Sequence, residues 1–237
     1  MRLAATHALG SLLRMGKPVV TTGDAALRLR QSLPAASRTL GRLAAAGLVL
    51  RVRRGLWSLD TRIDPLLLAE HLTAPFPSYV SFQTALSLHG MLSQIPQVVF
   101  LASLAPTRTL RTQLGTFSIH RLAPRFFGGF DTLESGIRLA RPEKALLDVL
   151  YLTPARSRLF ANLPEVEIPS TFDRAEAFRW VERIPEGPRR KAVSQRLEAL
   201  LSVQRPRMKE RQPTSGRRSP DSMARQRRRS RQMSGRS

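Results

Sequence analysis

The chain has 237 residues, 42% of them hydrophobic, which is enough for one large or two modest domains with proper cores. Its net charge of +22 points to a polyanionic partner. The absence of cysteine excludes disulfides, thiolate metal sites and cysteine catalysis. No apolar run approaches the roughly 18 residues of a membrane span, so we expect a cytoplasmic protein without a membrane segment.

The positive charge gathers at the two ends of the chain. Residues 1–60 carry a net charge of +8, residues 61–203 carry +4, and residues 204–237 carry +10. The middle of the chain is therefore the least basic part, and both ends have the composition of nucleic-acid-binding segments.

A helix from about Leu3 to Met15 is predicted at the start of the chain. Its apolar residues are interrupted and periodic and no A-x-A cleavage site follows, so we interpret it as a structural helix and not as a signal peptide. Pro18–Val20 is expected to form a short strand. A helix over Gly23–Leu29 follows, with Thr22 as its cap. Three of its apolar residues are expected to pack on the next helix: Ala26, Leu27 and Leu29.

The next helix, from about Pro34 to Ala46, has two distinct faces. Ser32 can cap it, proline suits its first turn, and Gly47 supplies the left-handed residue that ends it. Four residues at helical spacing form an apolar stripe: Ala36, Leu40, Leu43 and Ala44. On the opposite face, Arg38 and Arg42 project together from a surface of small residues. A helix of this shape fits a major groove about 12 Å wide, where arginine reaches guanine edges or phosphates.

After this helix the hydrophobic period changes to two, which predicts a hairpin. Arg54-Gly55 forms its turn, and its tip is expected to present three arginines together to phosphates or the minor groove. Helix, turn, helix and hairpin together predict a winged helix-turn-helix domain over residues 1–60. The candidate DNA-binding residues are Ser37, Arg38, Thr39, Arg42, Arg51, Arg53 and Arg54. The alternative is a small helical domain with a solvated basic face.

Residues 61–77 predict a helical linker, because Asp64 fits an N-cap with Pro65 at the first helical position. From Ser78 onward, short strands alternate with helices, which is typical of an α/β or α+β domain over residues 78–203. We expect strands near residues 98–101, 117–120 and 137–140. Helices are expected at residues 82–89, with Ser81 as cap and Gly90 as terminator, and at residues 142–152, 173–183 and 188–201. The fold class is thus α+β, with a mixed α/β C-terminal domain.

The composition changes again at about Gln204. Residues 204–237 are rich in arginine and serine and lack periodic apolar residues, which predicts a disordered tail. This tail is either a sequence-independent tether to nucleic acid or a solubilising extension.

Three blocks of the chain resemble the AbiEi family of antitoxins, found in type IV toxin–antitoxin and abortive-infection systems. They are RRGLWSL at residues 53–59, YVSFQTALSLHGM at 79–91 followed by QIP at 94–96, and RPEKALLDVLYL at 141–152. The resemblance spans about residues 1 to 200 and does not include the tail. It implies an N-terminal domain that binds inverted repeats in its own promoter. It also implies a C-terminal domain that counteracts a nucleotidyltransferase-like toxin, without a stable complex.

The sequence offers little support for catalysis. The four histidines lack metal-ligand spacing, and no motif for phosphate, dinucleotide or serine-nucleophile chemistry occurs. Glu143, Lys144 and Asp148 could serve as acid–base groups, but a surface ion pair between Lys144 and Asp148 explains them at least as well. An aromatic cluster at residues 126–130 is interpreted as core. We therefore expect no catalytic residue, no cofactor and no metal.

The first hypothesis is a transcriptional autorepressor that is also the antitoxin of a type IV system. It would be a monomer in solution and place two copies on double-stranded DNA. A second hypothesis is a winged-helix regulator whose C-terminal domain senses a ligand and which has no toxin partner. A third is an enzyme built on Glu143, Lys144 and Asp148.

Overall fold

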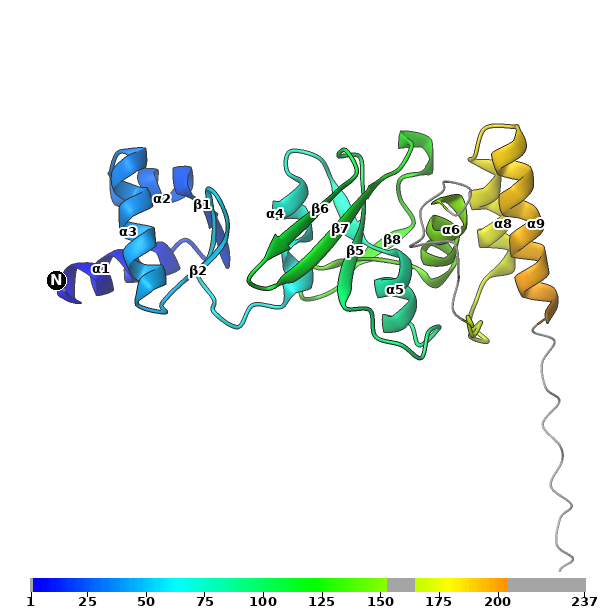
Figure 1. The fold of residues 1–237 in the computed structure, drawn as a ribbon, viewed down its shortest axis with the longest axis horizontal. Helices are drawn as coiled ribbons and strands as arrows, with labels where there is room; N and C mark the ends of the chain where they lie inside the picture. Colours follow the sequence, from blue (N-terminus) through cyan, green and yellow to red (C-terminus); the bar gives the residue numbers. More distant parts are fainter. Residues whose placement is uncertain (1, 153–164, 204–237) are drawn as a thin grey trace, which may run out of the picture. The chain divides into compact units, whose positions relative to one another are not determined.

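The computed structural model describes residues 2–152 and 165–203, and it confirms the α+β class. Helices combine with a three-stranded and a six-stranded sheet (Figure 1). The segment predicted as a tail, residues 204–237, lies outside the described residues. No helix in the described part of the chain is long and apolar enough to cross a membrane.

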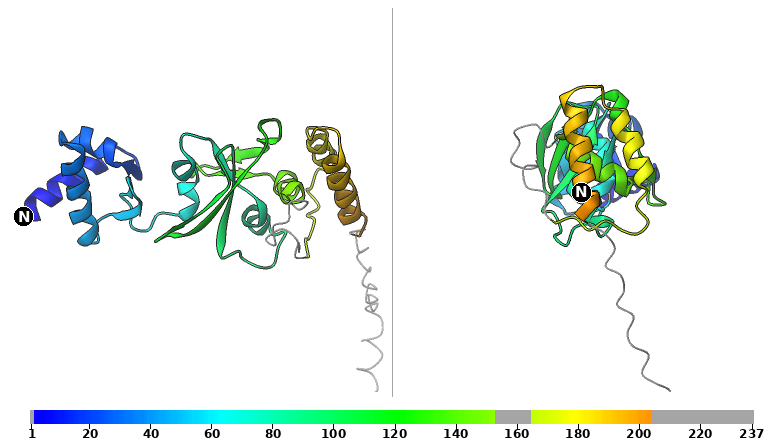
Figure 2. Two further views of the ribbon diagram at one scale, coloured as in Figure 1. Left: turned by 45° about the horizontal axis from the view of Figure 1, so that its top comes forward. Right: turned by 90° about the vertical axis from the view of Figure 1, so that its right-hand side faces the viewer.

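Three helices and the small sheet form the N-terminal part of the fold (Figures 1 and 2). The helices are α1 (Arg2–Leu13), α2 (Thr22–Leu29) and α3 (Leu33–Ala45). The strands are β1 (Val19–Thr21), β2 (Leu50–Arg53) and β3 (Leu56–Ser58), in the antiparallel order β1-β3-β2. The short strand predicted near Val19 therefore does pair with the returning strand of the hairpin.

Capping residues fix where α2 begins, one residue earlier than predicted. Thr21 is the N-cap, because its Oγ1 accepts the N–H of Asp24 while Asp24 Oδ2 accepts the N–H of Thr21. Thr22, the predicted cap, instead accepts a hydrogen bond of 2.9 Å from Trp57 Nε1. This bond ties the start of α2 to the centre of the small sheet.

The expectation that Leu27 packs on α3 is wrong, because its side chain is 83% exposed. Successive residues of a helix are about 100° apart, so a short helix buries only one narrow stripe. In α2 that stripe is centred on Ala25 and Ala26, which are both buried. Leu27 lies on the far side of the helix.

The C-terminal part is built around a mixed sheet with the strand order β6-β7-β5-β4-β9-β8. Its strands are β4 (Ser78–Val80), β5 (Val98–Ser103), β6 (Arg108–Thr112), β7 (Gly115–Arg121), β8 (Phe130–Thr132) and β9 (Arg138–Ala140). The β4–β9 and β5–β7 pairs are parallel, and the other three pairs are antiparallel. Three of these strands, β4, β6 and β8, were not predicted from the sequence, because each is short or has few apolar residues.

Helices complete this part of the fold. They are η1 (Pro65–Leu68), α4 (Ala69–Thr73), α5 (Phe82–Leu88), η2 (Pro124–Phe126), α6 (Pro142–Leu152), α8 (Arg174–Glu182) and α9 (Pro188–Val203). Asp64 caps η1 as predicted, by accepting the N–H of Leu66 at 2.9 Å. Helices α8 and α9 pack on each other and on α6 (Figure 2), so α6 is buried from Glu143 to Tyr151.

The apolar core has a small and a large cluster. The small one lies among α1, α2, α3 and one face of the three-stranded sheet. The large one fills the C-terminal part and also includes Val19, Val52 and Leu56 from the other face of that sheet. Both faces of the small sheet are therefore buried in part. The boundaries proposed at residues 60 and 77 stay predictions.

Candidate nucleic-acid interface

Helix α3 has the two faces that its sequence predicts. Ser32 Oγ accepts the N–H of Ala35, and the buried stripe of Ala36, Leu40 and Leu43 anchors the helix in the small core. On the other side Ser37, Arg38 and Arg42 are exposed. Gly47, with a φ of +70°, follows the helix as expected.

Thr39 was predicted to contact DNA, but its side chain is only 6% exposed. Its Oγ1 donates a hydrogen bond of 3.1 Å to Gln31 Oε1 and accepts one of 3.3 Å from Arg42 Nη2. The hydroxyl is thus engaged by two protein groups. We correct the prediction: Thr39 lies beneath the exposed face and contacts Arg42 from below.

The hairpin does not present its arginines together, which corrects a second prediction. A β-bulge shifts the register between Arg51, which is opposite Trp57, and Arg53, which is opposite Leu56. Side chains alternate between the two faces of a strand, so one extra residue moves those after it to the other face. The two arginines therefore lie on opposite faces of the sheet.

The contacts of the two arginines confirm this separation. The guanidinium of Arg51 lies over the Trp57 ring, 5.6 Å from its centroid, on the sheet face that packs on the helices. Arg53 Nη2 instead donates a hydrogen bond of 3.5 Å to the carbonyl of His71. Arg54 is exposed at the turn beside Gly55, whose φ is +80°. Six of the seven predicted residues are exposed, and Arg53 differs from the other five in lying on the opposite face of the sheet. These five are Ser37, Arg38, Arg42, Arg51 and Arg54.

A second polar cluster is buried in the C-terminal part, at Lys144 and Asp148. The sequence reading placed this pair on the surface, yet both side chains are completely buried. Lys144 Nζ donates to Asp148 Oδ1 and, at 2.9 Å, to the Tyr79 hydroxyl. Asp148 Oδ2 also accepts bonds of 3.0 Å from Tyr79 and 2.6 Å from Ser81. Ser81, expected to cap α5, uses its hydroxyl here instead.

Aromatic rings enclose the ammonium group of Lys144. Its Nζ lies 4.0 Å from the ring centroid of Phe126 and 5.0 Å from that of Trp180. Burial lowers the pKa of Lys144 and raises the pKa of Asp148, while the attraction between the two charges opposes both shifts. Burial, followed by the charge of Asp148, also raises the pKa of Tyr79 well above its ordinary value. Both side chains of the pair are completely shielded from solvent.

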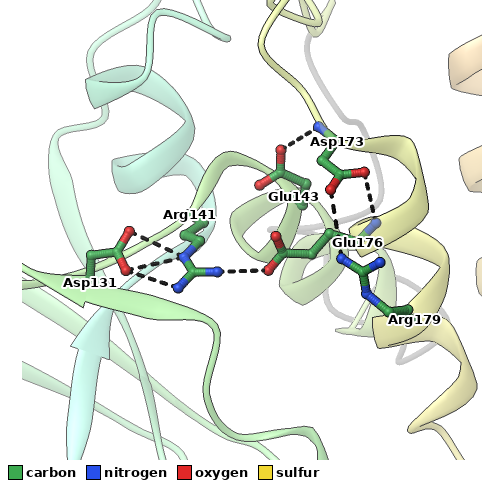
Figure 3. A network of polar contacts seen from close by, with 6 residues as sticks. All are labelled: Asp131, Arg141, Glu143, Asp173, Glu176 and Arg179. Carbon is green, nitrogen blue, oxygen red and sulfur yellow. Dashed lines mark hydrogen bonds and ion pairs between the residues drawn. The ribbon is translucent and has the colours of Figure 1, made fainter.

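A half-exposed ionic network attaches α8 to this core (Figure 3). Arg141 pairs with Asp131 and, at 3.1 Å, with Glu176 of α8. Glu143 Oε1 accepts the backbone N–H of Asp173 at 2.7 Å, just before α8 begins. Hydrogen bonding and attraction to Asp131 raise the pKa of Arg141. Glu143 therefore has a structural role at the base of α8.

Two of the four histidines, His89 and His120, have side-chain partners within the fold. His89 ends α5, as predicted, and its Nε2 donates to the carbonyl of Ala140 at 2.7 Å. His120 Nε2 lies 2.9 Å from Ser118 Oγ, and burial lowers the pKa of His120 to about 4. Among the described residues, no three potential ligands converge on a metal site.

No family model matches this chain, and a search of curated proteins finds no match either. The resemblance to AbiEi antitoxins thus rests on the three sequence blocks alone.

Proposed function

We propose that the protein binds double-stranded DNA through a winged helix-turn-helix formed by α2, α3 and the β2–β3 hairpin. The observation that carries the proposal is the exposed pair Arg38 and Arg42 on a helix whose opposite side is fixed in the core. Arg51 and Arg54 supply further positive charge from the hairpin. In this arrangement α3 enters the major groove, and the hairpin holds the adjacent backbone.

The proposed target is an inverted repeat in the promoter of the protein's own operon, with one copy on each half-site. Occupancy of that site represses transcription. The charge of +22 supports strong electrostatic attraction to DNA, so the affinity falls steeply as salt rises.

We further propose that the C-terminal part is an antitoxin that counteracts a nucleotidyltransferase-like toxin without forming a stable complex. Support comes from the resemblance and from one structural observation. Tyr79 and Ser81 belong to one of the resembling blocks, Lys144 and Asp148 belong to another, and the four side chains meet in one buried network. Side chains from the two blocks are thus joined in one buried hydrogen-bond network.

A mobility shift tests the DNA-binding proposal. The full chain is titrated against its own upstream DNA and against scrambled DNA at about 150 mM salt, where specific regulators discriminate by roughly 10³ or more. Arg42→Ala is expected to cost about 1–3 kcal/mol on the specific site and to relax the preference at one base position. Equal, weak binding of the wild type to both DNAs would contradict the repressor proposal.

The antitoxin proposal needs a separate test. Co-expression with the product of a neighbouring nucleotidyltransferase-like gene should restore growth that the toxin alone arrests. Failure to restore growth, with DNA recognition intact, would contradict the antitoxin proposal and favour a regulator without a toxin partner.

A further inference from the structure

The side chain of Arg42 is hydrogen-bonded to Thr39 before any DNA is bound, and Thr39 is itself hydrogen-bonded to Gln31. Gln31, in the turn between α2 and α3, accepts a hydrogen bond from the Thr39 hydroxyl at 3.1 Å. That hydroxyl in turn accepts a hydrogen bond from Arg42 Nη2 at 3.3 Å. The three residues form a hydrogen-bonded chain that runs from the turn, beneath the exposed face of α3, to a guanidinium group on that face.

The hydrogen bonds of these three residues all run from donor to acceptor in the order Arg42, Thr39, Gln31. A threonine hydroxyl has one proton and two lone pairs. Because its proton goes to Gln31, a lone pair stays available for the N–H of Arg42. The guanidinium has five N–H groups, so one bond to Thr39 leaves the others for a ligand. The bond to Thr39 therefore orients Arg42 without using it up.

We propose that Gln31 and Thr39 are positioning residues that pre-orient Arg42 for base recognition. The inference rests on the proposed DNA binding and assigns sequence specificity to two residues that need not touch DNA. An exposed arginine samples many rotamers, and ordering it on binding costs free energy. A guanidinium already held in one orientation loses less entropy when it makes two hydrogen bonds to a guanine edge.

We call the hydrogen-bonded chain Gln31–Thr39–Arg42 the relay. It should affect the affinity for a specific site and not the affinity for DNA of unrelated sequence. Phosphates attract a mobile arginine nearly as well as a fixed one, because that attraction depends mainly on charge. A guanine edge needs a defined position and plane of the guanidinium. Loss of the relay should therefore lower discrimination between DNA sequences while the salt dependence on scrambled DNA stays unchanged.

Thr39→Val tests the inference in the full chain, because valine has nearly the shape of threonine and lacks the hydroxyl. We expect it to reduce discrimination between the protein's own upstream DNA and scrambled DNA by about tenfold, the effect of one hydrogen bond to a charged group. Thr39→Ser, which keeps the hydroxyl, is the matched control and should discriminate like the wild type. Urea unfolding of each variant verifies that the fold is retained.

A double-mutant cycle separates positioning from a general structural effect. If Thr39 acts through Arg42, then Thr39→Val added to Arg42→Ala should cause no further loss of discrimination. NMR relaxation of the Arg42 guanidinium in the free protein gives a readout without DNA, and its motion should increase in Thr39→Val and remain restricted in Thr39→Ser.

The outcomes separate this inference from the proposed function. A wild type that discriminates, with Thr39→Val discriminating equally well, would overturn the relay and leave DNA recognition standing. Two other results would also overturn the relay. The first is that Thr39→Val reduces discrimination equally when Arg42 is already alanine. The second is that Thr39→Val weakens binding to scrambled DNA as much as binding to the specific site. A wild type that fails to discriminate would overturn both.

Discussion

Replacing Lys144 with methionine should strongly destabilise the protein. Methionine keeps an unbranched apolar side chain against Phe126 and Trp180 but removes the ammonium group. Asp148 would keep its hydrogen bonds to Tyr79 and Ser81 and lose its only cationic partner among the described residues. The carboxyl group would then be buried without a compensating charge.

The expected loss in the free energy of unfolding is about 3–5 kcal/mol near pH 7, the usual cost of removing one member of a buried ion pair. Both members here are completely buried, so solvent does not screen the remaining charge. The loss of the aromatic contacts with the ammonium acts in the same direction. Such a loss is a large fraction of the stability of a typical domain.

The loss should also depend on pH in a defined way. Without Lys144 the pKa of folded Asp148 rises further above its unfolded value of 3.8, because burial is no longer opposed. A raised folded pKa stabilises the folded state below pH 3.8, and this stabilisation disappears as pH rises toward the folded pKa. The difference between wild type and Lys144→Met should therefore be larger at pH 8 than at pH 5.

Urea unfolding followed by circular dichroism at pH 5, 7 and 8 measures both effects. Adding Asp148→Asn to Lys144→Met should remove the dependence on pH, because no carboxyl remains in the cluster. A single variant within 1 kcal/mol of the wild type at pH 7, or one whose deficit shrinks as pH rises, would refute this account of the pair.

Three further predictions concern other parts of the chain. Arg51→Ala should weaken DNA binding and lower the salt dependence by about 0.9 in slope, whereas Arg53→Ala, on the opposite sheet face, should have little effect; equal losses in salt titrations would contradict the role of the bulge. Neutral, buried His120 stabilises the folded state above its unfolded pKa of 6.5. This contribution, on the order of 3 kcal/mol, should be lost as pH falls toward about 4. In His120→Gln the free energy of unfolding should therefore change less steeply with pH over that range. Gly129→Ala should lower the free energy of unfolding by about 2–4 kcal/mol, because a Cβ there would lie 2.7 Å from Trp180 and φ is +73°. Gly136→Ala has the strain of a positive φ without the clash and should cost about 1 kcal/mol. Thermal unfolding of both variants measures the difference.

Local sequence signals predicted much of the secondary structure. The bounds of α6 agree with the prediction, and Ser32 and Asp64 cap α3 and η1 as expected. Three of the four residues in the predicted apolar stripe of α3 are buried, and the fourth, Ala44, is partly buried. These features depend on residues within one or two turns of each other, so a sequence contains the information needed to find them.

The burial of polar side chains was harder to predict. Lys144 and Asp148 have the spacing of a surface pair, and the sequence cannot show that Tyr79, Phe126 and Trp180 come from distant segments to enclose them. The apolar residues on every side of α6 were a signal that the helix lies within the core. The same limit applies to Thr39, whose exposure depends on how the turn folds over it.

The sequence by itself determined the α+β class, the cap and buried stripe of α3, the cap of η1, and the concentration of positive charge at the ends of the chain. Only the tertiary structure decided which polar groups face solvent. A one-residue bulge separates Arg51 from Arg53, Thr39 lies beneath Arg42, and a lysine–aspartate pair lies in the core. The physical reason is that periodicity and capping are local properties of the chain, whereas burial and register depend on which distant residues pack against a side chain.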